Sequence, residues 1–283
     1  MRYEGIDTAG HITAKKAQIL RAEGISFVAR YLVPPDMWKS LTAQEAADIR
    51  NAGLALMLCW ELGGEDLKGG AVKGAEHGAR ASGLAEALGV PAGTVIYFAV
   101  DYNAPAADYE PIAAYLRAAQ DAIGTRYRAG VYGSYGVAEA MALRIPGIPV
   151  WQCVAWSGGL WSAHAAVRQY AWQGDPRAKA LAAKVGCDVD LDAAETLEGM
   201  WEAAGETPHT GETPQSAAQT APLLGELTGE PWYAEAMAWA KEKGYIRDGR
   251  PNDPLTRAEL ATVLWRMFGP EDEKTDSGLL SDE

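Results

Sequence analysis

The chain has few of the residues that bind metal ions or form disulfides. Its 283 residues include three cysteines and four histidines. No cysteine pair has the C-x-x-C spacing and the histidines are far apart in the sequence, so the residues do not support a zinc site. Cys59, Cys153 and Cys187 lie in or beside apolar runs, which is typical of buried free thiols. Their odd number indicates synthesis in a reducing compartment, and we expect neither a metal nor another cofactor.

Basic residues are also scarce. There are 25 lysines and arginines against 38 aspartates and glutamates, for a net charge of −13. Because nucleic-acid binding needs clustered positive charge, we expect no nucleic acid partner. The same charge argues against non-specific attraction to an anionic membrane or wall polymer.

Long apolar runs are missing. None approaches the ~20 residues of a membrane-spanning helix, and residues 1–7 lack the apolar core of a signal peptide. We therefore expect no membrane span and synthesis in the cytoplasm without a signal peptide. A target outside the membrane would require another route of export.

Several familiar catalytic motifs are absent as well. The sequence has no H-E-x-x-H motif and no Gly-rich phosphate loop. The segment 133–136, Gly-Ser-Tyr-Gly, has the wrong glycine spacing for a nucleophile elbow. No cysteine has a histidine partner in its sequence context, although pairing in space stays open.

The sequence does contain enough apolar residues for a large core, since 48% of its residues are hydrophobic and 22% are charged. The length suits one large domain plus something small. At the centre lies Val95 to Val100, an unbroken apolar and aromatic run followed at once by Asp101. Such a run predicts a strand covered on both faces. In α/β folds active sites lie at the C-terminal ends of strands. A helix N-cap is the alternative interpretation of Asp101.

Eight segments in all are predicted as strands. They are Tyr3–Asp7, Ser26–Tyr31, Leu54–Trp60, Val95–Val100, Arg128–Tyr132, Pro149–Val154, Val167–Gln173 and Cys187–Asp192. Helices are predicted at 13–23, 42–51, 70–88 and 108–123, with a short one ending at Leu143. The last three units carry long loops in place of clean helices.

This alternation predicts parallel β/α units. The number of strands fits the α/β class and a (β/α)8 TIM-like barrel. A doubly wound open sheet is the alternative, but it would be expected to carry a Gly-rich phosphate loop.

The chain changes character after the predicted barrel, residues 1–201. Residues 202–227 are rich in Pro, Thr and Gly and are predicted to be a flexible linker. Residues 228–269 are predicted to form a small helical unit with two short helices. Residues 270–283 form an acidic tail.

Acidic residues end several predicted strands. They are Asp7 on the first, Glu61 on the third, Asp101 on the fourth, and Asp188 and Asp190 on the eighth. In a barrel these ends converge on one face. Two carboxyl groups across a cleft are the minimum for glycosidic hydrolysis, one as the acid and one to support the oxocarbenium-like centre or activate water. For any single residue, a cap or a salt bridge is the alternative.

Aromatic residues share the strand ends and could stack on sugar rings, with core packing as the alternative for each. They are Tyr31, Trp60, Tyr97, Tyr102, Tyr132, Trp151, Trp156, Tyr170 and Trp172. Tyr102 and Trp172 are the better candidates because each follows the apolar part of its strand.

Five short motifs stand in an order that is familiar from one family. They are Gly5-Ile6-Asp7, Ile96-Tyr97-Phe98-Ala99-Val100-Asp101, Gly130-Val131-Tyr132-Gly133, Arg168-Gln169-Tyr170 and Asp188-Val189-Asp190-Leu191-Asp192. Residues 1–200 thereby resemble a glycoside-hydrolase-like domain of unknown function found in actinobacterial and phage proteins, which looks related to the family-25 lysozyme-type muramidases. The resemblance implies a barrel acting on peptidoglycan or a related glycan. It also implies that Asp7 and Asp101 are active-site carboxylates and that Asp190 lines the site.

The chain departs from the muramidases at one position. They carry Asp-x-Glu at the fourth strand, where the Glu is the general acid, but this chain has Asp101-Tyr102-Asn103. An asparagine cannot donate a proton as an acid does. Asp101 or Glu61 would then have to serve as the acid, or the domain binds glycan without cutting it.

The C-terminal unit resembles a single S-layer homology repeat, most clearly at residues 256–259, Thr-Arg-Ala-Glu. Such repeats hold proteins to secondary cell-wall polymers, and tethering raises the local substrate concentration. We therefore predict a peptidoglycan hydrolase that acts at the cell wall and fits a phage or prophage lysin released by a holin. A non-catalytic glycan-binding protein is the alternative, since a fold alone does not decide function. The residues predicted to contact the glycan are Asp188, Asp190, Tyr102, Asn103, Tyr132, Tyr170 and Trp172.

Overall fold

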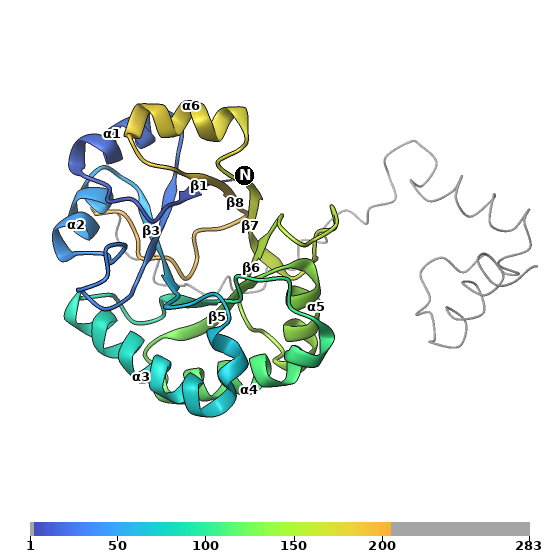
Figure 1. The fold of residues 1–283 in the computed structure, drawn as a ribbon. Helices are drawn as coiled ribbons and strands as arrows, with labels where there is room; N and C mark the ends of the chain where they lie inside the picture. The colour runs from blue at the N-terminus through green and yellow to red at the C-terminus, as the bar shows by residue number, and fades with distance from the viewer. Residues whose placement is uncertain (1–2, 205–283) are drawn as a thin grey trace, which may run out of the picture. The chain divides into compact units, whose positions relative to one another are not determined.

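The computed structural model describes residues 3–204, which form a closed eight-stranded barrel surrounded by helices (Figure 1). The strands are β1 (Tyr3–Asp7), β2 (Phe27–Tyr31), β3 (Ala55–Trp60), β4 (Val95–Ala99), β5 (Arg128–Gly133), β6 (Val150–Cys153), β7 (Ala165–Ala171) and β8 (Asp190–Ala194). Each strand pairs with its neighbour in sequence, and β8 closes the barrel onto β1. The predicted TIM-like barrel is confirmed.

The last strand breaks the parallel pattern. β1 to β7 are parallel, whereas β8 is antiparallel to both β7 and β1. The prediction of parallel units throughout is therefore wrong for β8. As a consequence, the first residue of β8 lies at the same end of the barrel as the last residues of the other strands.

The helices lie on the outside of the barrel (Figure 1). They are α1 (Ala14–Ala22), α2 (Ala43–Asn51), α3 (Gly70–Ala87), α4 (Tyr109–Ile123), α5 (Tyr135–Arg144) and α6 (Pro176–Val185), with short 3-10 helices at Asp66–Gly69 and Ala106–Asp108. The side chains of Thr13 and Thr42 cap α1 and α2 as expected.

The prediction of long loops in the last three units is wrong at α6. This helix has an Asp175 N-cap, Pro176 in its first turn and Gly186 in the left-handed conformation at its end, all of which are standard boundary signals. Its Ala178, Leu181 and Val185 are buried. The connection from β6 to β7, residues 154–164, does lack an α-helix.

Two apolar layers hold the barrel together, one inside it and one between sheet and helices. In β4 the side chains of Val95, Tyr97 and Ala99 belong to the inner layer, whereas Ile96 and Phe98 belong to the outer layer. Because both faces of the strand are buried, an unbroken apolar run is what this position requires.

The end of the barrel formed by the strand N-termini is closed by the segment 197–204. Trp201 pairs with Leu56 through two backbone hydrogen bonds, and the Arg50 guanidinium stacks on its ring. Arg50 also donates to the Glu202 carbonyl and accepts from the Ala204 amide. These contacts bind residues 202–204, predicted as the start of the linker, to the barrel.

Glycines in α3 allow it to pack closely on α4. A Cβ at Gly74 would overlap the Tyr115 carbonyl oxygen, and one at Gly78 would lie 2.6 Å from the Ala119 carbonyl oxygen. The glycines that weaken the sequence signal for this helix are therefore packing residues.

We expect Gly74→Ala to lower the free energy of unfolding by roughly 1–3 kcal/mol, because two helix backbones must move apart. Gly83 lies in the same helix with open space around the Cβ position, so Gly83→Ala is expected to stabilise by about 0.5–1 kcal/mol. Urea denaturation of both variants checks this pair. If the two substitutions change the free energy of unfolding equally, close packing of α3 on α4 does not require a glycine at position 74.

The remaining predictions on domain organisation lie outside the described residues. They are the rest of the linker up to residue 227, the S-layer-homology-like repeat at 228–269 and the acidic tail at 270–283. Within residues 3–204, none of the helices has the length and apolar character needed to cross a membrane.

Candidate active site

A cavity of about 130 Å³ opens at the end of the barrel where β1 to β7 finish. Its lining is polar and acidic and comes from all eight strands or the residues just after them. The lining residues are Asp7, Tyr31, Cys59, Glu61, Ala99, Asp101, Tyr132, Trp151, Gln169 and Asp190. The structure thus brings together four of the five predicted carboxylates, from strands far apart in the sequence.

Asp7 is the most enclosed of these four carboxylates. It ends β1, directly opposite Asp190 of β8 in the register, and its Oδ2 accepts a hydrogen bond of 2.7 Å from Gln169 Nε2. Burial, together with the negative charge of Asp190, raises the pKa of Asp7 to about 7. Asp7 can therefore exchange a proton near neutral pH.

Asp190 reaches the cavity because β8 runs antiparallel. Its Oδ1 accepts from the Gln173 amide at 2.8 Å, and its Oδ2 accepts from Gln169 Nε2 at 3.3 Å. Burial raises its pKa, while the Gln173 hydrogen bond opposes the rise. Gln169 thus bridges Asp7 and Asp190.

Asp101 follows β4 and is the exposed carboxylate of the cavity. Its backbone amide donates to the Gly64 carbonyl, which holds the two loops together. Partial burial and the neighbouring charge of Glu61 raise the pKa of Asp101, and the positive charge of Lys39 lowers it. The helix-cap alternative does not describe this residue, because Asp108 is the residue at the N-cap of α4.

Glu61 also lines the cavity, but it is held by a lysine. Lys39 Nζ lies 2.9 Å from Glu61 Oε1 and 4.2 Å from the centre of the Tyr31 ring. The salt-bridge interpretation of Glu61 is therefore confirmed, and its alternative role as the acid stays a prediction.

Replacing Lys39 with methionine is expected to raise the pKa of Asp101, because the variant loses a cation that lowers it and leaves Glu61 uncompensated. Carboxyl carbon NMR titration would measure the shift. Lys68→Met is the matched control, since Lys68 lies over the Tyr102 ring and pairs with Glu65. If both variants titrate like the wild type, Asp101 does not sense Lys39.

One predicted glycan-binding tyrosine lies in the cavity and two do not. Tyr132 lines it, packs on Trp151 at 4.5 Å between ring centres and donates to Gln169 Oε1. Tyr102 instead donates to Asp108. Tyr170 alternates with the inward-facing Gln169 on β7 and donates to Glu4.

Three other predicted residues lie near the cavity without lining it. Trp172 follows β7 and is exposed. Asn103 is exposed in the loop after β4. Asp188 precedes β8, and its carbonyl oxygen accepts from the Thr8 hydroxyl.

Sequence reasoning missed residues that organise the site. Asp192 is fully buried and accepts from Trp151 Nε1 at 2.8 Å. Gln169 and Lys39 bind the predicted carboxylates. Asp190 and Asp192 are two residues apart in a strand, so both side chains lie on the same face of β8. This spacing was the sequence signal that could have identified Asp192 as a site residue.

The cysteine at the cavity wall is a buried thiol. Burial raises the pKa of Cys59 well above its usual value, so the thiol stays protonated. Cys153 is also buried, as expected, whereas Cys187 is only half-buried. In the part of the chain that the structure describes, histidine, cysteine and acidic side chains form no cluster of three or more suited to a metal ion.

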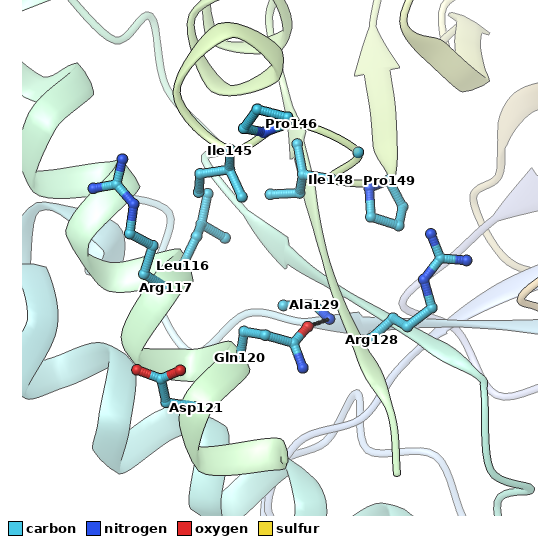
Figure 2. Close-up of a pocket in the computed structure, with 11 residues that line it drawn as sticks. Leu116, Arg117, Gln120, Asp121, Arg128, Ala129, Ile145, Pro146, Ile148 and Pro149 are labelled. Atoms are coloured by element: carbon cyan, nitrogen blue, oxygen red, sulfur yellow. Dashed lines mark hydrogen bonds between the residues drawn. The ribbon is translucent and has the colours of Figure 1, made fainter. Parts of the chain in front are cut away.

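A larger hollow of about 420 Å³ lies at the opposite end of the barrel, near the start of β5 and β6 (Figure 2). Apolar residues of the loop 145–149 form much of its wall (Figure 2). The side chain of Gln120 has a structural role there, because its Oε1 accepts a hydrogen bond from the Ala129 amide. Arg117 donates to the Arg144 carbonyl and lies 3.5 Å from Glu110. The acidic cavity is therefore the better candidate for an active site.

Comparison with known proteins gives a family match. Residues 18–194 match the family model described as the Rv2525c-like, glycoside hydrolase-like domain. A curated protein of Bacillus subtilis strain 168, the uncharacterized protein YbfG, is 37% identical over 145 residues, which cover 45% of this chain and 20% of that protein. The chain thus spans about one fifth of the length of this relative.

Two solved structures share the fold. The Tat-secreted protein Rv2525c of Mycobacterium tuberculosis, in complex with L-tartrate, is 27% identical with a TM-score of 0.58, covering 70% of this chain and 98% of that one. An uncharacterized protein of B. stearothermophilus is 21% identical with a TM-score of 0.52, covering 70% and 100%.

Proposed function

Because this chain belongs to the Rv2525c-like, glycoside hydrolase-like family, we propose that its barrel hydrolyses glycosidic bonds in the glycan strands of peptidoglycan. One observation carries the proposal: carboxyl groups from four different strands meet in a single cavity, and Asp7, Asp101 and Asp190 among them have raised pKa values. Paired carboxyl groups of different proton affinity are the equipment of glycosidic hydrolysis.

The environments of Asp7 and Asp101 suggest their roles. Asp7 lies deep among like charges and holds its proton up to about pH 7, so it is suited to protonate the leaving oxygen. Asp101 is the exposed carboxyl group of the cavity, and Lys39 opposes the rise that burial and Glu61 cause in its pKa, so it is the better candidate to support the anomeric carbon or activate a water molecule. Glu61, paired with Lys39, would shape the field around Asp101.

Exposed tryptophans around the cavity support a glycan ligand. Trp38, Trp156 and Trp172 lie in the connections after β2, β6 and β7, at the same end of the barrel as the cavity. Trp156 has φ of 54°, a left-handed conformation that is rare for a bulky residue. Such strain is often found at functional sites, and exposed indole faces can stack on sugar rings.

The direct test is to incubate the full chain with purified peptidoglycan and to measure the release of new reducing ends. Glycosidic hydrolysis produces one reducing end for each bond cleaved. Loss of turbidity without new reducing ends would exclude hydrolysis of glycosidic bonds.

Non-catalytic glycan binding is the second candidate, and Asn103 favours it. This residue stands where the related muramidases carry their acid, and it is exposed and lies outside the cavity wall. Retention on sedimented walls without any release of reducing ends would support this candidate.

The place of action is also part of the proposal. The motif at residues 256–259 supports a wall-binding repeat that keeps the barrel at the cell wall. Deleting residues 228–283 should reduce retention on walls.

A further inference from the structure

Asp192 lies beneath the cavity and has too few hydrogen-bond donors for a charged group. Its side chain is fully buried, and Trp151 donates to Oδ1. Oδ2 is also buried, and no donor in residues 3–204 reaches it. A buried carboxylate with one hydrogen bond is strongly disfavoured relative to the neutral acid.

The groups around Asp192 cannot supply another donor. Gln169, its neighbour in the β7–β8 register, uses its amide nitrogen on Asp7 and Asp190. The amide oxygen of Gln169 is occupied by the Tyr132 hydroxyl. The charged groups that face Asp192 are the carboxyls of Asp7 and Asp190, which are both acidic.

Asp192 is also a diagonal neighbour of Asp7: Asp7 lies opposite Asp190 in the β1–β8 register, and the side chains of Asp190 and Asp192 lie on the same face of β8. Two ionised carboxylates in such a position repel each other, and neither carries a proton to donate to the other. A proton on Asp192 resolves both problems, because it neutralises the buried group and supplies the missing donor.

We propose that Asp192 is a positioning residue that keeps its proton at neutral pH and donates a hydrogen bond to the carboxyl group of Asp7. This bond stabilises the Asp7 carboxylate that forms when Asp7 gives its proton to the leaving oxygen. The proton on Asp192 is not consumed: it stays on Asp192 while the Asp7 proton moves to the substrate. The catalytic consequence rests on the proposed function, but the protonation of Asp192 does not.

The hydrogen bond from Asp192 limits how far the pKa of Asp7 rises. Burial and Asp190 raise the pKa of Asp7, whereas the hydrogen bonds from Gln169 and Asp192 lower it. Without Asp192 as a donor, Asp7 would retain its proton to higher pH and be a weaker acid.

The test compares Asp192→Asn with Asp192→Leu in the full chain by carboxyl carbon NMR titration of Asp7. An asparagine can donate to Asp7 and accept from Trp151, so Asp192→Asn should leave the pKa of Asp7 near 7. Leucine cannot donate, so Asp192→Leu should raise it. A fall in the Asp7 pKa in Asp192→Asn would overturn the proposal, because it would show that wild-type Asp192 is an ionised neighbour.

Reducing-end release gives the second readout. Asp192→Asn should keep the wild-type pH profile, and Asp192→Leu should lose roughly tenfold or more in rate with the alkaline limb displaced to higher pH. If Asp192→Leu does not fold, the Asp192→Asn titration alone decides. A wild type that shows the expected titration but releases no reducing ends would refute the hydrolase and leave the protonation of Asp192 standing.

Discussion

Replacing Asp101 with asparagine is expected to lower the rate of reducing-end release from peptidoglycan by roughly 10²–10⁴-fold. The amide has nearly the same shape, but it cannot stay ionised beside the anomeric carbon or take a proton from water. Within the described residues, the Asp101 side chain makes no hydrogen bond or ion pair, so the substitution should not unfold the barrel.

Binding and folding must be measured in the same variant to interpret that loss. Sedimentation with walls should be unchanged in Asp101→Asn, because binding by the surrounding aromatics does not need this charge. Asp36→Asn is the matched control, since Asp36 is exposed in the loop after β2 at the same end of the barrel. Equal rates for wild type and Asp101→Asn would remove Asp101 from the chemistry.

Replacing Asp7 with asparagine is expected to stabilise the protein at neutral pH while abolishing hydrolysis. The pKa of Asp7 is raised from 3.8 to about 7. The stability that depends on this proton is therefore fully present below about pH 4 and is lost as the pH rises through 7. The loss amounts to as much as about 4 kcal/mol, at 1.36 kcal/mol for each pKa unit.

An asparagine at position 7 does not titrate and can still accept the hydrogen bond from Gln169. The unfolding free energy of Asp7→Asn minus that of the wild type should therefore grow by up to about 4 kcal/mol between about pH 4 and pH 8. Urea denaturation at both pH values measures this difference. Asp121→Asn, on the exposed side of α4, should show no such growth. A difference in unfolding free energy that does not change with pH would mean that folding does not raise the pKa of Asp7.

These two results together would identify a site built at the expense of stability. Placing Asp7, Asp190 and Asp192 in one buried region lowers the free energy of unfolding. Replacing one of these carboxyl groups with an uncharged amide would restore part of it. Active sites that need a proton at neutral pH are expected to carry such a cost.

Much of the barrel could be predicted because its signals are local. In β4 the run from Val95 onward is apolar on both faces, since one face meets the barrel interior and the other meets the helices. Asp7 and Asp101 could be predicted to meet because parallel strands end at the same side of a barrel. The start of α2 could be predicted because Thr42 caps it within one turn.

The direction of β8 could not be predicted in this way. Alternation of inward and outward side chains is the same when a strand is read from either end, so the pattern of Asp190 and Asp192 carries no direction. The prediction placed Asp190 at the cavity as the end of a parallel strand, whereas Asp190 begins an antiparallel one. Its position was right, and the reason for it was wrong.

By itself, the sequence determined which residues form strands and which carboxylates leave the core at their ends, because hydrophobic burial and chain geometry act over a few neighbouring residues. Only the tertiary structure decided the state of those carboxylates. Lys39 pairs with Glu61 across 22 positions of sequence, and Gln169 reaches Asp7 across 162. Proton affinity depends on such distant neighbours and on burial, and both exist only once the barrel has closed.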